Sequence, residues 1–114
     1  MFGLSKRDIE TIYDILEKYS DIHSVYLFGS RAKGTYRQGS DIDLAIINNQ
    51  LSLNQIIQLK DDFENSSLPY FVDIVDYTAI KDPLLKKSIR QFGKEIYSIS
   101  NFCAIATAVQ RTLR

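Results

Sequence analysis

GSRAKGTYRQGSDIDLAI, residues 29–46, is the stretch from which the rest of the chain can be interpreted. A run of β-branched and aromatic residues, Ser24 to Phe28, leads into its Gly-Ser pair. A second apolar run, Asp41 to Ile47, follows its polar, glycine-bearing middle part. Both runs have the composition and length of strands. The stretch therefore predicts two strands that are joined by a polar connection.

Asp41 and Asp43 lie two residues apart on the second predicted strand. Side chains alternate along a strand, so both carboxylates project from one face, roughly 6 to 7 Å apart, while apolar residues such as Ile42 and Leu44 project from the other. A buried, unpaired carboxylate is very costly, so these two are either solvated or bound to a cation. Mg²⁺ suits such a pair because it is held by one or two carboxylates together with waters and phosphate oxygens. The alternative is an Asp-x-Asp that merely begins a strand at the wet surface.

Gly29 and Ser30 follow the first predicted strand directly. Glycine lets a phosphate approach the backbone closely, serine adds a hydroxyl, and the N–H groups that follow point at an anion. Arg31 and Lys33 add positive charge. The segment is not a P-loop, because no G-x-x-x-x-G-K-[ST] occurs in the chain. A common turn with a solvated basic face is the alternative interpretation.

Asp73 interrupts an otherwise apolar run, Phe71 to Val75. A carboxylate in the middle of an interior strand needs a partner. Neighbouring strands lie about 4.8 Å apart, so pairing with the strand of Asp41 and Asp43 would bring three carboxylates together. Such a cluster favours one or two divalent cations, which can clamp the attacking and leaving oxygens of a phosphoryl displacement. The alternative is an ion pair with a basic residue of segment 81–94.

Helices and further strands are predicted on both sides of this centre. Ser5 with Asp8, and Ser52 with Gln55, have the spacing of capping boxes at helix starts. Asp82-Pro83 begins a third helix that Gly93 ends. Tyr70 to Val75 is a predicted third strand and Glu95 to Ile99 a short edge strand; residues 101–114 form a mildly amphipathic tail that is treated as a flexible end. Because helices and strands interleave, we expect an α/β (α+β) domain with a small mixed sheet packed against helices.

Composition narrows the class of protein. The 114 residues fit one domain, and 45% hydrophobic with 25% charged residues is typical of a soluble globular protein. Fourteen basic residues balance fourteen acidic ones, which argues against binding nucleic acid by bulk positive charge. The one cysteine, Cys103, excludes an internal disulfide and a cysteine-based zinc site. No long apolar stretch or secretory signal is present, so we expect no membrane association and a cytoplasmic location.

The spacing of these residues resembles a known family. Gly29-Ser30, ten residues and then Asp41-Ile42-Asp43 are similar to the signature of the DNA polymerase β-like nucleotidyltransferases. The whole string 29–46 resembles their minimal members (MNT), which are often paired with HEPN-domain proteins in toxin–antitoxin modules. The lone strand residue Asp73 extends the resemblance to about residue 76.

The resemblance implies a function and a role for each residue. It implies one polymerase β-like nucleotidyltransferase domain over 1–114, with Asp41, Asp43 and Asp73 as catalytic residues that hold two Mg²⁺ ions, or Mn²⁺ in their place. It also implies that Gly29 and Ser30 contact the nucleotide, with Arg31 beside them. The implied reaction transfers AMP from ATP to a tyrosine hydroxyl of a HEPN-type partner and so silences a toxin.

Two other functions remain open at this point. The chain could be a partner-binding module that keeps the fold without catalysis, although such a module gains nothing from three converging carboxylates. It could also be a nucleotidyltransferase of a small hydroxyl compound, although larger relatives of that type add a second domain. A template-dependent polymerase fits least, because of the zero net charge.

Overall fold

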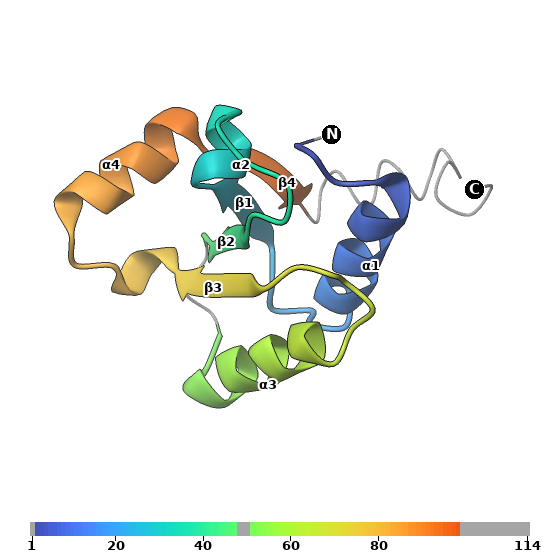
Figure 1. Ribbon diagram of the computed structural model, residues 1–114. Coiled ribbons are helices and arrows are strands. Elements are labelled where there is room, and N and C mark those ends of the chain that lie inside the picture. The colour runs from blue at the N-terminus through green and yellow to red at the C-terminus, as the bar shows by residue number, and fades with distance from the viewer. Residues whose placement is uncertain (1, 48–50, 99–114) are drawn as a thin grey trace.

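The computed structural model describes residues 2–47 and 51–98, which form a four-stranded mixed sheet between two layers of helices (Figure 1). In chain order the elements are α1 (Lys6–Leu16), β1 (Ser24–Phe28), α2 (Ser30–Lys33), β2 (Ile42–Ile46), α3 (Leu53–Glu64), β3 (Val72–Asp76), the 3-10 helix η1 (Tyr77–Ala79), α4 (Pro83–Phe92) and β4 (Lys94–Ser98). The predicted α+β architecture is confirmed. No helix in the described part is long and apolar enough to cross a lipid bilayer.

The helix starts follow the predicted capping residues. Ser5 and Asp8 exchange hydrogen bonds of 3.0 Å with each other's backbone N–H groups, and Ser52 and Gln55 do the same at the start of α3. The side chain of Asp82 accepts a 2.9 Å hydrogen bond from the backbone N–H of Leu84 at the start of α4. These bonds satisfy N–H groups that have no acceptor within the helix.

The sheet has the strand order β3-β2-β1-β4. β1 pairs antiparallel with β2 and with β4, whereas β2 and β3 run parallel. The pairing that would bring the carboxylates together, left as a condition by the sequence, is present in the structure, where Asp43 and Asp73 are direct register partners. The predicted edge strand is also present, as β4 at one side of the sheet.

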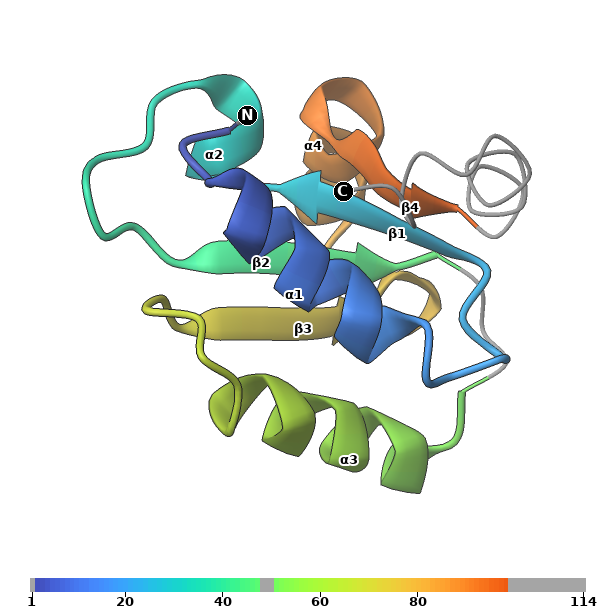
Figure 2. The same cartoon turned by 90° about the vertical axis from the view of Figure 1, so that its right-hand side faces the viewer.

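The core lies on one face of the sheet, under α1 and α3. Ile42, Leu44 and Ile46 of β2 have no exposed surface and belong to one cluster with residues such as Leu16 and Leu59 of those helices. The side chains that alternate with them, those of Asp43 and Ala45, face the other way, toward α2 and α4. Figures 1 and 2 show α1 and α4 on opposite sides of the strands. The carboxylate of Asp43 therefore lies on the face of the sheet opposite to α1 and α3.

Two strands differ in length from the prediction. β2 begins at Ile42, so Asp41 precedes it, and β3 begins at Val72 rather than at Tyr70. Pro69 has no N–H to donate to a sheet, and the Tyr70 ring packs under the Arg31 guanidinium, 4.5 Å from its centroid, which holds this segment outside the strand. The end of the predicted edge strand at Ile99 and the tail 101–114 lie outside the described residues.

Candidate active site

Three carboxylates gather where β2 and β3 begin. Asp43 and Asp73 are register partners on adjacent parallel strands, and Asp41 lies two residues before Asp43. Phe28, the last residue of β1, pairs with Asp43 on its other side, so the Gly29-Ser30 turn begins beside the same carboxylate. The sheet thus brings five of the predicted site residues to the same end of the sheet: Gly29, Ser30, Asp41, Asp43 and Asp73.

Asp43 is the electrostatic centre of this group. Burial, followed by the like charges of Asp73 and Asp41, raises the pKa of Asp43 from its ordinary value of 3.8 to about 6, while the Arg31 guanidinium acts in the opposite direction. Like charges in partial burial disfavour ionisation. A bound cation would remove the free-energy cost of ionising Asp43, because its positive charge compensates the charge of the neighbouring carboxylates.

The donor chemistry fits a hard divalent cation. Within residues 2–47 and 51–98, however, no group of three or more His, Cys, Asp or Glu side chains closes around a common point that would hold a metal ion. Mg²⁺ needs only one or two carboxylates, because waters and substrate phosphates supply its other oxygens. Asp41, Asp43 and Asp73 as metal ligands therefore stay a prediction with suitable chemistry.

Gly29 is fixed in this place by its backbone and by its neighbour. Its φ of 75° and ψ of −152° belong to a region that is essentially restricted to glycine. A Cβ atom at this position would lie 2.5 Å from Oδ2 of Asp43, well inside van der Waals contact. Glycine is therefore required for the turn to pass directly over the carboxylate, and this close approach is what brings α2, which begins at Ser30, next to the site.

Arg31, predicted to lie beside the nucleotide, has a buried side chain in the structure. The side chain is 2% exposed, and its guanidinium donates hydrogen bonds to backbone carbonyls: Nη2 to Ser40 at 2.6 Å, Nη1 to Phe2 at 2.9 Å, and Nε to Ser40 and Asp41 at 3.2 and 3.3 Å. Its face also packs on the ring of Tyr70. The guanidinium is thus committed to protein groups, and we assign it a positioning role, in which it holds the connection 34–41 and so the backbone of Asp41.

The sequence alone did not reveal this role of Arg31. Its ligands are carbonyl oxygens, which every residue carries, so no side-chain pattern marks them. The one sequence signal for this role was the aromatic character of Tyr36 and Tyr70, whose rings contact the guanidinium. The Tyr36 ring centroid lies 5.4 Å from the guanidinium carbon.

Comparisons with known proteins show which family and fold this chain shares. The model of a family described as "Polymerase beta, Nucleotidyltransferase" matches residues 10–102. "Probable protein adenylyltransferase MntA" of Haemophilus influenzae is 29% identical over 97 residues, which cover 84% of this chain and 81% of the relative. A Methanocaldococcus jannaschii protein whose name carries the same activity is 33% identical over 79 residues, covering 68% of this chain and 79% of that protein.

Solved structures share the fold. A toxin–antitoxin crystal structure with AMP-PNP superimposes with a TM-score of 0.66 and 23% identity, covering 93% of this chain and 95% of the matched chain. A complex of a tri-AMPylated Shewanella oneidensis HEPN toxin with an MNT antitoxin gives a TM-score of 0.60 and 22% identity, over 91% of this chain and 83% of the matched one. At these identities the likeness shows the fold alone.

Proposed function

The chain belongs to the polymerase β-type nucleotidyltransferase family, and from this premise we propose that it transfers AMP from ATP to a hydroxyl group of a HEPN-type partner protein and thereby acts as an antitoxin. The names of its relatives support AMP transfer to a protein. The complexes of the structural neighbours support a HEPN partner. We further propose a tyrosine as the acceptor residue.

The observation that carries the proposal is the direct pairing of Asp43 with Asp73 beside Gly29. In the proposed reaction, the backbone N–H groups of Gly29 and Ser30, where the turn leads into α2, bind the β- and γ-phosphates. Asp41 and Asp43 hold the divalent cation, proposed to be Mg²⁺. When bound, this cation neutralises charge on the phosphates and stabilises the transition state.

Asp73 is proposed to act on the acceptor. It lies on the edge strand β3, exposed to solvent, so an incoming hydroxyl can reach it while the nucleotide contacts Asp43. The acceptor oxygen forms a bond to the α-phosphorus as the bond to the β-phosphate oxygen breaks, the hydroxyl proton passes to Asp73, and pyrophosphate leaves. Most of the rate enhancement then comes from positioning and from charge stabilisation.

The test uses ATP labelled at the α-phosphate, Mg²⁺ and a purified HEPN-domain partner that was produced without the native chain, so that its acceptor hydroxyl is unmodified. We expect label on the partner with the native protein and none with the Asp41→Asn/Asp43→Asn variant. Mass spectrometry of the labelled peptide identifies the acceptor residue. The matched control is Asp14→Asn/Asp21→Asn, which removes two carboxylates away from the sheet edge.

The outcomes separate the functions that the sequence left open. A partner that is neutralised by the Asp41→Asn/Asp43→Asn variant as well as by the native chain contradicts catalysis and favours a contact-only module. Label on a small hydroxyl compound but on no protein contradicts the proposed acceptor. Label on a residue other than tyrosine leaves transfer intact and corrects the acceptor alone.

A further inference from the structure

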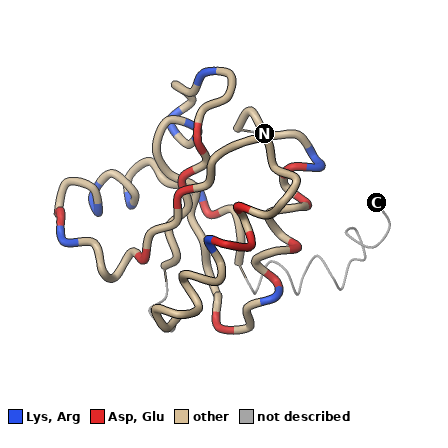
Figure 3. The backbone as a smooth tube through the Cα atoms, turned by 60° about the horizontal axis from the view of Figure 1, so that its bottom comes forward, with Lys and Arg blue, Asp and Glu red and all other residues tan. Residues whose placement is uncertain are grey.

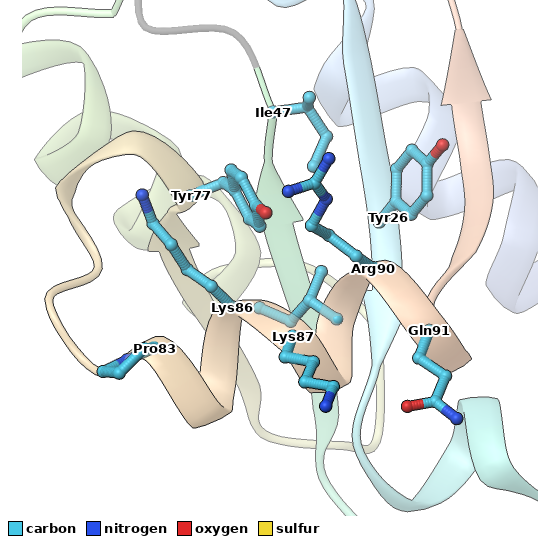
Figure 4. Close-up of a pocket in the computed structure, with 9 residues that line it drawn as sticks. Tyr26, Ile47, Tyr77, Pro83, Lys86, Lys87, Arg90 and Gln91 are labelled. Atoms are coloured by element: carbon cyan, nitrogen blue, oxygen red, sulfur yellow. The ribbon is translucent and has the colours of Figure 1, made fainter.

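A cleft outside the carboxylate site lies between α4 and the sheet (Figure 4). It encloses about 890 Å³. Its lining comes from four parts of the chain: Tyr26 of β1, Ile47 after β2, Tyr77 of η1, and the α4 residues Pro83, Lys86, Lys87, Ile89, Arg90 and Gln91. Figure 4 shows Lys86 and Arg90 extending on the same side of α4 as Tyr77 and Ile47, whereas Lys87 and Gln91 extend on the opposite side.

The charge of this cleft is of one sign. The α4 sequence PLLKKSIRQF contains three basic residues and no acidic one. Figure 3 shows basic positions along this helix. Among the described residues, none of the three cations is recorded in an ion pair with a carboxylate. The acidic residues that flank α4 in sequence are engaged elsewhere: Asp82 accepts from the backbone N–H of Leu84, and Glu95 accepts from the Ser24 hydroxyl. Asp76, next to Tyr77, accepts from Thr78.

Apolar surface accompanies this charge. Tyr26, Ile47 and Tyr77 contribute rings and a branched side chain to the cleft, and the ammonium of Lys86 lies 5.2 Å from the Tyr77 ring centroid. Leu84, near the start of α4, is 75% exposed, and Phe92 at its end is 42% exposed. Leu84 shares the face of α4 that carries Lys87 and Gln91, so the apolar surface beside Lys86 and Arg90 is that of Tyr26, Ile47 and Tyr77.

The cleft lies on the same face of the sheet as the carboxylates but at a distance from them. Asp43, Ala45 and Ile47 alternate along β2, and Tyr26 pairs with Ala45. Ile47 lies four positions after Asp43, just beyond the end of β2, which corresponds to about 13 Å along an extended chain. Ile89, 1% exposed, packs α4 onto the sheet between them. The cleft is thus a separate position on the face of the sheet that carries Asp43, and a protein that lies across α4 lies on the same face as the carboxylates.

We propose that the α4 cleft, comprising Lys86, Arg90, Tyr26, Tyr77 and Ile47, docks an acidic segment of the protein acceptor that also carries an apolar side chain. Charge complementarity selects the acidic residues, and the rings and Ile47 take the apolar one. The chain as a whole carries no excess of basic residues, which argues against a nucleic acid and favours an acidic polypeptide as the occupant. The choice of occupant rests on the proposed function; the binding property of the cleft does not.

The test measures binding without nucleotide. The probe is a short fluorescein-labelled peptide rich in glutamate that contains phenylalanine, and its fluorescence polarisation is followed as the full chain is added. We expect the Lys86→Glu/Arg90→Glu variant to bind the peptide at least about tenfold more weakly, and Lys86→Gln/Arg90→Gln to be weakened in the same direction. The matched control, Lys6→Glu/Arg7→Glu, makes the same charge change on α1 and should bind as the native chain does. Thermal unfolding checks that each variant is folded.

Two further probes distinguish the cleft from a general basic surface. A peptide with serine in place of phenylalanine should bind several-fold more weakly, because it loses the apolar contact. A triadenylate should not displace the phenylalanine peptide. Equal binding by the charge-reversed variant and the native chain, or displacement by triadenylate, overturns the proposal.

An assay with the HEPN-domain partner separates this failure from failure of the proposed function. If the partner is labelled equally fast by the native chain and by Lys86→Glu/Arg90→Glu at a partner concentration below saturation, docking at α4 is wrong while transfer stands. If the native chain labels no protein, transfer is wrong, and the peptide measurement still decides whether the cleft binds acidic segments.

Discussion

Gly29 is the residue at which the smallest chemical change should have the largest effect. In Gly29→Ala, the added methyl group meets Oδ2 of Asp43 at 2.5 Å and the backbone is held in a region that disfavours alanine. We expect a loss of about 1–3 kcal/mol in the free energy of unfolding and loss of AMP transfer. Urea unfolding and the α-labelled ATP assay measure the two effects.

Gly34 offers the control for this substitution. It also has a positive φ, 80°, but a Cβ there meets no atom within 4 Å. Gly34→Ala should therefore lose stability through the backbone while transfer is retained. If Gly29→Ala keeps full transfer activity, the turn at Gly29 is not the phosphate contact.

Arg31 is expected to act through the backbone that it holds. In Arg31→Lys, a single ammonium replaces a planar group that serves the carbonyls of Phe2, Ser40 and Asp41, so some of these acceptors lose their donor. We expect the free energy of unfolding to fall by roughly 2 kcal/mol. The KM for ATP should change less than kcat, because the guanidinium donates its hydrogen bonds to backbone carbonyls of the protein. A large rise in KM at unchanged thermal stability would instead make Arg31 a direct ligand.

At the scale of the elements, the pairing of β2 with β3 links the behaviour of two carboxylates. Asp73 is one of the two like charges that raise the pKa of Asp43. In Asp73→Asn we therefore expect the pKa of Asp43 to fall from about 6 toward its ordinary value, while burial keeps it from returning fully. Carbon-detected NMR of the Asp43 carboxyl group over a pH series measures this.

A substitution on the other edge of the sheet serves as the control for this titration. Glu95 of β4 is separated from Asp43 by β1, so Glu95→Gln should leave the pKa of Asp43 unchanged. An unchanged Asp43 titration in Asp73→Asn would show that the two carboxylates do not interact.

The elements also show how far the sequence could be interpreted. Ser5, Ser52 and Asp82 predicted three helix starts correctly, because capping depends on residues three or fewer positions apart. The start of β3 was misplaced at Tyr70, because what holds Tyr70 outside the strand is Arg31, thirty-nine positions earlier in the chain. Local signals thus placed the elements, and a distant contact decided one boundary.

For the whole molecule, the raised pKa of Asp43 makes stability depend on pH. Between pH 3.8 and about 6 the folded state binds more protons at Asp43 than the unfolded state does, so the free energy of unfolding falls as pH rises through this window. We expect Asp43→Asn to remove this contribution. The melting temperature of the variant should therefore rise relative to that of the native chain as pH increases from 5 to 7. Thermal unfolding of both proteins over this range, without divalent ions, measures the difference.

Mg²⁺ should have the opposite dependence. It binds the ionised carboxylate, so its stabilising effect on the native chain should grow as pH rises past 6 and be absent in Asp41→Asn/Asp43→Asn. An equal rise in melting temperature for both proteins would place the bound Mg²⁺ elsewhere. The same series with Mn²⁺ decides which ion is bound more strongly.

The sequence by itself determined the order of the elements, the face of β2 that carries Asp43, and the family resemblance, because these depend on alternation and on short spacings. Only the tertiary structure decided that Asp73 is the register partner of Asp43, that Arg31 is buried as a backbone support, and that α4 places Lys86 and Arg90 over a cleft with Tyr26 and Ile47. These three results join residues that are far apart in the chain. Their physical cause is strand pairing and burial, which depend on the whole sheet and leave no local pattern in the sequence.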